Sequence, residues 1–415
     1  MLPDSPAADL VLMQHACARL GAALFPYRRG LPSAELAAMA AATGAEWRWC
    51  PDSGRLERTP VVAREVGFSG GTLALLVKTS GSSGTPKVAM LTAGNLLTSA
   101  WYANRQFGLA PGDTWLACLR LSHVGGLSIS YRCALAGATL LLHDGFDVAA
   151  VARDLTERAV SHLSVVPPML ARLLDLGLSP PPGLRVLMVG GQALGPVLTQ
   201  RALDAGWPLH LSYGMTETAS HVASTERLAG RVADPACAGH LLDCVETNLT
   251  VRGGPPARLR LRGPVVMAGY ANPTRRSGDG LDDGWFEAAD LACRGADGQL
   301  RVLGRADDVL VIGGTNVSRQ RVEGVLQSAP RIGDLVVVGL ADPVWGQRLA
   351  VVHTGDLAPR ELADWCRSRL SGPERPRLQL RLPRLPLLDS GKFDRVRIAA
   401  LARRFGHDLP QVATR

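Results

Sequence analysis

The feature that most constrains the fold is an alternation of short apolar runs with helical patterns over residues 72–213. The apolar runs predict strands, and the segments between them carry apolar residues at helical spacing. This alternation is typical of a doubly wound, mainly parallel α/β sheet. Strands are expected at 73–77, 137–143, 162–166, 184–191 and 209–213, and helices at 93–107, 148–160, 167–177 and 195–206.

The amino-acid composition and the length of the apolar runs change after this region. Between about residues 225 and 300, Gly, Pro and Asp are dense and the apolar runs are short, which predicts a β-rich subregion. The last stretch has three or four strand patterns and helices at 358–370 and 394–404. We therefore expect a large domain over residues 1–304, opening with helices at 5–22 and 33–42, and a small, mobile α+β domain over 305–415. The hinge is expected at Gly304–Asp308.

Composition excludes several classes of protein. Hydrophobic residues make up 47% and charged residues 20%, which excludes wholesale disorder. No run of eighteen apolar residues appears, so we expect no stable membrane insertion. The N-terminus carries Asp4 and Asp9 and lacks the basic start of a secretory signal. The eight cysteines are scattered without a CxxC pair, which indicates reduced thiols in a cytoplasmic protein.

The net charge of +8 does not indicate a nucleic-acid partner. The arginines are dispersed and aromatic residues are only 5%, so no basic, aromatic surface is predicted. Small polyanionic ligands fit the charge equally well. Of the 45 basic residues only three are lysines, at positions 78, 87 and 392. Because arginine replaces lysine almost everywhere, a surviving lysine is a candidate for a task that needs a compact point charge.

Two of these lysines lie in loops with suitable chemistry. The loop that ends at Lys87 offers glycines whose backbone approaches an anion and hydroxyls that donate to phosphate oxygens. Its spacing is GxxGxxK, which is not a Walker A loop, and a flexible surface loop is the alternative. Its candidate residues are Thr79, Ser80, Gly81, Ser82, Ser83, Gly84, Thr85 and Lys87. Lys392 stands in Asp389-Ser-Gly-Lys, before the last helix, where an exposed turn is the alternative.

A third loop follows a predicted strand directly. In Ser212-Tyr-Gly-Met-Thr-Glu-Thr218, the tyrosine ring could stack on a purine and the glutamate could hold Mg²⁺. The loops at 79–87, 190–193 and 213–217 are all expected beyond the carboxyl ends of strands, where doubly wound sheets bind ligands.

Five motifs in this order carry a resemblance to a known family: TSGSSGTPK (79–87), YGMTE (213–217), GWFEAAD (284–290), GRADDVLVIGGTNVSRQRVE (304–323) and DSGK (389–392). Together they resemble the acyl- and aryl-adenylate-forming superfamily, over roughly residues 10–405. The resemblance implies ATP, Mg²⁺ and CoA as ligands, and two half-reactions that form an acyl-adenylate and then a thioester.

The resemblance also implies roles for individual residues. Loop 79–87 would hold phosphates, Glu217 would bind the metal, and Lys392 would be the catalytic lysine. Asp307 would be the hinge. The adenine and ribose would lie against Gly190, Gly191, Tyr213, Gly214, Met215, Thr216, Asp290 and Arg305. After rotation of the small domain, Gly313 and Gly314 would face CoA.

Within the superfamily, the stretches at 119–147, 162–175, 188–198 and 207–220 resemble the 2-succinylbenzoate–CoA ligases of menaquinone biosynthesis. Such a substrate has two carboxylates, and the one that does not react needs a fixed partner. Arg132, nine residues after His123, fits that task by bidentate pairing. His123, Gly191 and Ser212 would complete the acyl site, with His123 also near the CoA tunnel.

Some positions depart from the family pattern, and alternatives stay open. Val88 replaces a usual glycine, and Ala288 and Ala289 replace Thr-Gly before Asp290. Another acyl- or aryl-CoA ligase, or an adenylation enzyme that loads a carrier protein, would share all the ATP motifs. A non-catalytic nucleotide-binding protein is a remote alternative, disfavoured by Lys392. The oligomeric state is not fixed by the sequence, and a homodimer is compatible with it.

Overall fold

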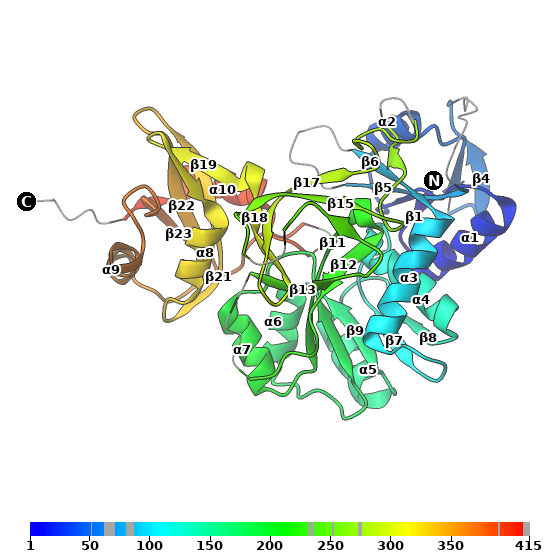
Figure 1. The fold of residues 1–415 in the computed structure, drawn as a ribbon, viewed down its shortest axis with the longest axis horizontal. Coiled ribbons are helices and arrows are strands. Elements are labelled where there is room, and N and C mark those ends of the chain that lie inside the picture. The colour runs from blue at the N-terminus through cyan, green and yellow to red at the C-terminus, as the bar shows by residue number, and fades with distance from the viewer. Residues whose placement is uncertain are drawn as a thin grey trace, which may run out of the picture.

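The structure is a computed structural model that describes residues 1–50, 52–61, 71–79, 87–230, 234, 236–250, 253–272, 276–388 and 391–409. The chain forms a large N-terminal domain and a smaller C-terminal domain, which lie side by side in Figure 1. This arrangement confirms the predicted α/β class. The proposed boundary after residue 304 stays a prediction, since Arg305 is the last residue of a strand in the large domain's sheet.

The centre of the large domain is an eleven-stranded sheet whose first half is parallel, in the order β8-β7-β9-β10-β11. Neighbouring residues of β7 face opposite helical layers, because Leu116 packs with one buried cluster and Trp115 with another. The strands are β7 (Thr114–Ala117), β8 (Thr139–Leu142), β9 (His162–Val165), β10 (Val186–Val189) and β11 (Leu209–Met215).

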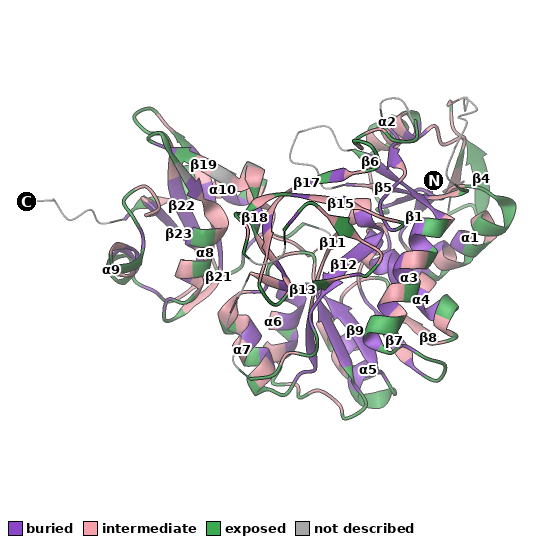
Figure 2. Ribbon diagram, viewed as in Figure 1, coloured by how far each residue is buried: buried purple, intermediate pink, exposed green. Residues whose placement is uncertain are grey.

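Helices cover both faces of this parallel half, as the prediction required. Helices α5 (Val148–Glu157), α6 (Pro167–Asp175) and α7 (Pro196–Asp204) supply apolar residues to one face, and α3 (Ala93–Phe107) and α4 (Val124–Ala136) to the other. Both faces are therefore buried, which Figure 2 shows as purple strands between helices. Proline at the first positions of α6 and α7 starts each helix, and Thr92 caps α3 in a reciprocal pair with Asn95.

The second half of the sheet is antiparallel and forms the predicted β-rich subregion. It continues from β11 in the order β12-β13-β18-β17-β15-β14. Its strands are β12 (Ser220–Ser224), β13 (Cys237–Leu241), β14 (Glu246–Thr247), β15 (Ala257–Arg262), β17 (Phe286–Arg294) and β18 (Leu300–Arg305). Strand β11 thus belongs to both halves, since it pairs in parallel with β10 and antiparallel with β12.

One strand prediction was wrong in its partners. β5 (Leu73–Lys78) is not part of the parallel sheet; it pairs antiparallel with β6 (Val88–Thr92) in a three-stranded sheet with β16 (Gly269–Tyr270). The loop 79–87 is therefore the connection of a hairpin and not the carboxyl end of a parallel strand. An apolar run shows that a strand is buried, but it does not show which strand lies beside it.

The N-terminal segment packs against this smaller sheet through the bridge between Leu24 and Leu75. Both helices predicted here are present, as α1 (Ala7–Leu20) and α2 (Ser33–Thr43). Two short strand pairs accompany them: β1 (Leu2–Pro3) with β2 (Pro26–Tyr27), and β3 (Trp47–Cys50) with β4 (Arg55–Arg58).

The C-terminal domain begins at the short helix η2 (Ala306–Asp308), which holds the backbone of the predicted hinge residue Asp307. Its four-stranded sheet is covered by α8 and α9 on one face and by α10 on the other. The elements are β19 (Val309–Ile312), β20 (Thr315–Ser318), α8 (Arg319–Gln327), β21 (Ile332–Asp342), β22 (Gly346–Gly355), α9 (Pro359–Arg369), β23 (Leu378–Arg381), α10 (Arg395–Phe405) and β24 (His407–Asp408).

Within the part of the chain that the structure describes, no helix combines the length and the apolar character that crossing a membrane requires.

Candidate active site

The parallel half of the sheet has a switch point between β7 and β9. β7 leads through α4 to the edge strand β8, whereas β9 leads through α6 to β10 on the other side, so the chain departs in opposite directions. A crevice opens at such a point, beyond the carboxyl ends of the strands. His123 lies there as the residue before α4, and Val166 as the residue before α6.

The first group of site residues joins β11 to β17, two strands that are not neighbours in the sheet. The hydroxyl of Tyr213 donates to Oδ2 of Asp290 over 2.5 Å. Burial raises the pKa of Tyr213, and the charge of Asp290 raises it further, so the phenol stays protonated and remains a donor. Asp290 pairs with Arg305 across the β17–β18 ladder. Tyr213 and Arg305, which are 77 and 15 positions away from Asp290 in the sequence, are therefore its neighbours in space.

Glu217 lies in the short helix η1 (Thr216–Thr218) and is held by two contacts. The hydroxyl of Tyr270 donates to its Oε1 over 2.8 Å, and its backbone carbonyl accepts from the amide of Met267 over 2.8 Å. Nζ of Lys87 lies 4.8 Å from the centre of the Tyr270 ring, a cation–π contact. Tyr270 was missed by the sequence analysis. With only five tyrosines in the chain, each buried hydroxyl was a candidate for a specific partner.

Lys392 comes from the C-terminal domain and reaches this group. Its loop is closed by its own backbone carbonyl, which accepts from the amide of Leu388 over 2.7 Å. Burial lowers the pKa of Lys392, and the charge of Arg305 lowers it further, while Asp290 and Glu217 oppose the shift. The lysine therefore shares one electrostatic environment with all three. We call Tyr213, Glu217, Tyr270, Asp290 and Lys392 the carboxylate cluster.

Glycines allow the two domains to approach closely around this lysine. A Cβ added to Gly391, which has φ of +78°, would lie 2.9 Å from Val166 and 3.2 Å from Met169 of α6. A Cβ on Gly191 would lie 3.4 Å from Cε of Lys392. On the same side, a Cβ on Gly195 would lie 2.9 Å from Gln327 of α8. The predicted residue Gly191 thus lies next to the predicted lysine, with room between them for no more than a methyl group.

Arg132 lies in α4 and has no exposed surface. Its guanidinium carbon is 5.2 Å from the centre of the Trp115 ring, and Nη2 donates to Oγ of Ser220 over 3.2 Å. Nη1 lies 4.0 Å from Sδ of Met188, and Nε has no partner. Burial lowers the pKa of Arg132 to about 10, so it remains a cation at neutral pH. Among the described residues, no carboxylate pairs with it.

His221 of β12 lies beside this arginine and was also missed by the sequence analysis. It is 1% exposed, and neither ring nitrogen has a partner among the described residues. Burial, with a smaller contribution from the charge of Arg132, lowers the pKa of His221 to about 3, so the ring is neutral. The hydroxyl of Ser128 donates to that of Ser220 over 3.2 Å. We call Ser128, Arg132, Ser220 and His221 the arginine cluster. Only a three-dimensional structure could have shown that Nε of Arg132 and both ring nitrogens of His221 lack hydrogen-bond partners among the described residues.

The other predicted residues lie in the loops and strands around these clusters or outside the described part of the chain. Thr79 and Lys87 close the base of their loop through an amide-to-carbonyl hydrogen bond of 2.8 Å, whereas Ser80–Thr85 lie outside the described residues, as do Asp389 and Ser390. The side chain of Asp307 is likewise not described. The remaining predicted residues that line β10, β11 and η1 are Gly190, Ser212, Gly214, Met215 and Thr216.

Gly313 and Gly314 form the turn between β19 and β20 and lie apart from the carboxylate cluster. Gly313 donates its amide to the carbonyl of Trp345 over 2.9 Å, and Gly314 faces open space. The structure therefore does not bring these two predicted CoA residues to the other site residues.

The carboxylate cluster fits a magnesium ion that is shared with phosphates. In the part of the chain that is described, no three His, Cys, Asp or Glu side chains form a metal-binding group. Mg²⁺ needs no such group, because it is usually bound by one or two carboxylates together with substrate phosphates and water. Glu217 offers one carboxylate, whose Oε1 is already oriented by Tyr270.

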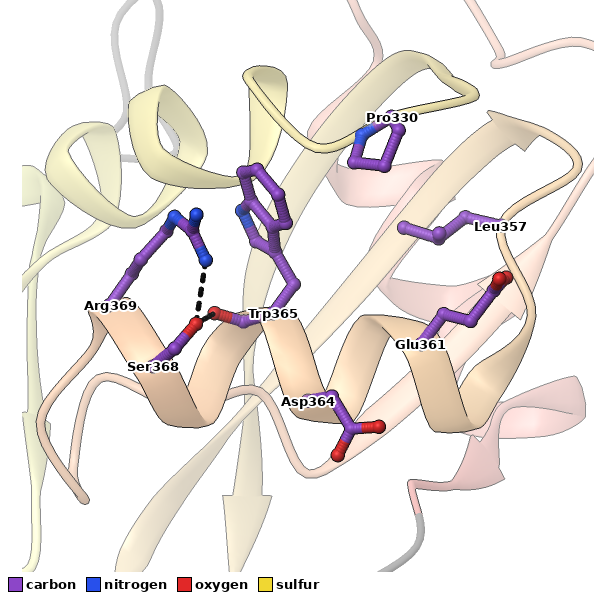
Figure 3. Close-up of a pocket in the computed structure, with 7 residues that line it drawn as sticks. All are labelled: Pro330, Leu357, Glu361, Asp364, Trp365, Ser368 and Arg369. Carbon is purple, nitrogen blue, oxygen red and sulfur yellow. Dashed lines mark hydrogen bonds between the residues drawn. The ribbon is translucent and has the colours of Figure 1, made fainter.

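A cavity of about 340 Å³ on the C-terminal domain is a different feature. Figure 3 shows it beside α9, where Ser368 accepts a hydrogen bond from Arg369 over 2.6 Å. It is lined by Pro330, Leu357, Glu361, Asp364, Trp365, Ser368 and Arg369. None of these residues was predicted to be functional, and none belongs to either cluster.

Comparison with known proteins identifies the family. The family described as AMP-binding enzyme matches residues 51–271, and the AMP-binding enzyme C-terminal domain matches residues 321–392. A 2-succinylbenzoate–CoA ligase from Bacillus licheniformis is 34% identical over 331 residues, which are 78% of this chain and 69% of that protein. The corresponding ligase from Bacillus cereus is 33% identical over 329 residues, 77% and 68% of the two chains.

Solved structures that resemble this chain include enzymes with the same activity in their names. The o-succinylbenzoate CoA synthetase (MenE) of Bacillus subtilis in complex with the acyl-adenylate OSB-AMP has a TM-score of 0.80 and 27% identity, covering 96% of this chain and 86% of that one. Its complex with ATP and magnesium also has a TM-score of 0.80, with 27% identity and coverage of 95% and 87%. A double mutant bound to a product analogue, OSB-NCoA, scores 0.64 at 27% identity, covering 96% and 87%. The chain belongs to the AMP-binding enzyme family.

Proposed function

We propose that this protein is a 2-succinylbenzoate–CoA ligase. It activates one carboxylate of the acid with ATP, giving an acyl-adenylate and pyrophosphate, and then transfers the acyl group to CoA with release of AMP. Its ligands are ATP, Mg²⁺, CoA and the aryl acid. The observation that carries the proposal is the position of Lys392, which the C-terminal domain delivers to Asp290, Glu217 and Arg305 of the large domain.

In the first half-reaction, an oxygen of the substrate carboxylate attacks the α-phosphorus of ATP, and pyrophosphate leaves. The difficulty is to bring two anions together and to stabilise the charge that develops. Lys392 lies between the carboxylate and the α-phosphate as a point charge, and Lys87 with loop 79–87 holds the outer phosphates. Asp290 accepts from the ribose, with Arg305 beside it. Magnesium, held at Glu217, supplies further neutralisation of the phosphate charge.

The adenine ring lies along Gly190, Gly191 and the strand Tyr213–Met215, with Thr216 at its end. Tyr213 contributes in two ways, because its ring faces the base while its hydroxyl fixes Asp290. A carboxylate that is held by a protonated phenol keeps its orientation before the nucleotide arrives, and this preorganisation lowers the cost of binding.

In the second half-reaction, the sulfur of CoA attacks the acyl carbon and AMP leaves. We propose that the small domain first rotates about Asp307, which withdraws Lys392 and brings Gly313 and Gly314 to the CoA side, near His123. The arrangement in the structure is that of the adenylating state. In support, the B. subtilis enzyme fits this chain with a TM-score of 0.80 in its OSB-AMP complex but 0.64 as the mutant with the product analogue.

The acyl group occupies the crevice between α4 and the sheet, bordered by His123, Gly191 and Ser212. Arg132 binds the carboxylate that does not react. A buried cation without a protein counter-ion is costly unless a ligand supplies the negative charge, and a second carboxylate does so.

The test is an activity screen with ATP and CoA over a panel of carboxylic acids that includes 2-succinylbenzoate, with AMP release as the readout. We expect 2-succinylbenzoate to give the highest kcat/KM. A preference for an acid with one carboxylate would refute the proposed substrate, and AMP-forming transfer to a carrier protein in place of CoA would refute the ligase. We propose a cytoplasmic site of action and no nucleic-acid partner. Light scattering distinguishes a monomer from the homodimer with which the sequence is compatible.

A further inference from the structure

The further inference concerns His221, to which the sequence analysis assigned no role. Buried polar groups are nearly always hydrogen-bonded, because the free energy of removing an unpaired one from water is not offset by a new hydrogen bond. His221 is 1% exposed with both ring nitrogens unpaired, and the adjacent Arg132 is fully buried with Nε unpaired. Three unpaired nitrogens on two adjacent buried side chains, among the residues that the structure describes, indicate a place for a ligand that can accept hydrogen bonds.

The position of His221 fits the deep end of the acyl crevice. It lies opposite Gly214 across the β11–β12 ladder, next to Ser220, which already binds Arg132. Met188, a further neighbour of Arg132, lies on β10 two residues before Gly190, which is about 7 Å along an extended chain. The arginine cluster thus lies below the loop that holds Gly190 and Gly191.

We infer that His221 binds the unreactive carboxylate of the acyl substrate together with Arg132, and that this pair selects dicarboxylic over monocarboxylic aryl acids. The inference rests on the proposed function. Arg132 supplies the charge, and a ring N–H of His221 donates a second hydrogen bond that fixes the direction of the carboxylate. Because no exposed surface remains on Arg132, a neighbour must move when the acid enters. Met188 is suited to this, since its thioether is flexible and a weak acceptor.

A matched control is available in His210 of β11. Its ring centre lies 5.6 Å from that of Phe107, and the ring of His221 lies 5.5 Å from the same phenylalanine. His210 differs in one respect: its Nδ1 is hydrogen-bonded to the carbonyl of Thr225 over 3.2 Å. The two histidines therefore share a buried aromatic environment, but only His210 is engaged in holding the fold together.

The experiment measures kcat/KM of the full-length enzyme for 2-succinylbenzoate and for two analogues, each lacking one of its carboxylates. The variants are His221→Leu, His221→Gln and His210→Leu. In His221→Leu, the preference for the dicarboxylate over the better analogue is expected to fall at least about 10-fold, the loss of one hydrogen bond to a charged group. His221→Gln, which keeps a donor, should retain most of the preference, and His210→Leu should leave it unchanged.

Thermal stability provides the second readout. Removing an unpaired buried polar group should not destabilise the fold, so the Tm of His221→Leu should stay level or rise by about 1–3 °C. That of His210→Leu should fall. If His221→Leu does not fold, His221→Met serves in its place.

A preference in His221→Leu within about threefold of the parent overturns the inference, whatever the Tm. The parent alone tests the proposed substrate. If the parent prefers another dicarboxylic acid, that acid and its monocarboxylic analogue decide the inference; if it prefers acids with one carboxylate, the inference falls as well.

Discussion

The carboxylate cluster and the arginine cluster both include residues of the β11–β12 pair. They differ in whether their buried polar groups have hydrogen-bond partners in the structure. In the first, Asp290 and Glu217 each accept a hydrogen bond from a tyrosine, and Lys392 lies in their field. In the second, Arg132 has no carboxylate partner among the described residues, and neither ring nitrogen of His221 has a hydrogen-bond partner there. The carboxylates of the first cluster have hydrogen-bond partners before any ligand binds, whereas polar atoms of the second cluster are still unpaired.

The difference indicates what each cluster is selected for. Groups that are oriented in advance bind and stabilise a common cosubstrate with little reorganisation, which suits the adenylation chemistry shared across a family. Groups left unpaired reduce stability and gain it back only from a particular ligand, which suits recognition of one acid. The following predictions test this division.

The largest effect is expected from Lys392→Ala in the carboxylate cluster. Adenylate formation should fall roughly 10³-fold, because a preorganised charge is lost where negative charge develops. Thioester formation from added acyl-adenylate should be largely preserved, and Lys392→Arg should not restore adenylation, since a fork does not replace a point charge. Rapid-quench assays of the separate half-reactions measure both. An equal loss in the two would indicate a folding defect.

Arg132→Ala tests the other cluster. The KM for the dicarboxylic acid should rise about 30- to 1000-fold, equivalent to about 2–4 kcal/mol for a charge-assisted contact, while the KM for ATP changes little. Steady-state kinetics with each substrate varied in turn provide the measurement. Parallel changes for the acid and ATP, or no change, would show that Arg132 does not anchor the carboxylate.

The substitution Asp307→Pro tests whether thioester formation requires the small domain to move. Proline fixes φ near −65°, so one orientation should be frozen. We expect the adenylating orientation to survive, with a single turnover of adenylate and pyrophosphate, and thioester formation to fall at least about 10²-fold, some 2.7 kcal/mol of barrier. The affinity for the acid should hardly change, because the arginine cluster belongs wholly to the large domain. A folded variant, checked by circular dichroism, that forms thioester at the parental rate would argue against rotation.

The smallest effect is a shift in pH dependence. Lys392 must carry its proton, and burial lowers its pKa while Asp290 raises it. The rate of adenylation should therefore fall as pH rises through that pKa. Asp290→Asn removes a charge that favours the ammonium form, so the alkaline limb should move to lower pH. Single-turnover rates at saturating ATP locate the limb, and an unchanged or higher position would show that Asp290 and Lys392 are not coupled.

Local patterns in the sequence were sufficient for the fold class. Together with the family resemblance they also named every residue of the carboxylate cluster except Tyr270, and Arg132 of the arginine cluster. Alternation predicted the helices on both faces of the sheet, and scarcity singled out Lys87 and Lys392. Pattern could not place β5, because strand partners are set by tertiary packing. It also missed Tyr270, whose partner Glu217 is 53 residues away. His221 lay beyond reach for a different reason: its signal is the lack of a partner, which no sequence pattern records.

The glycines between the domains have a consequence for turnover. At Gly191, Gly195 and Gly391 the two domains come within van der Waals reach without a side chain from the glycine to bury. The hydrophobic contribution to an interface grows with the apolar area that is removed from water. A contact made through glycine backbone buries little apolar area, so the two domains approach closely but bind each other weakly. Such a contact would let the small domain deliver Lys392 and, in the rotation proposed above, withdraw it again at little cost. A methyl group would be tolerated least at Gly391, where it would lie 2.9 Å from Val166 in a backbone conformation that favours glycine, and it would hold the small domain away from α6.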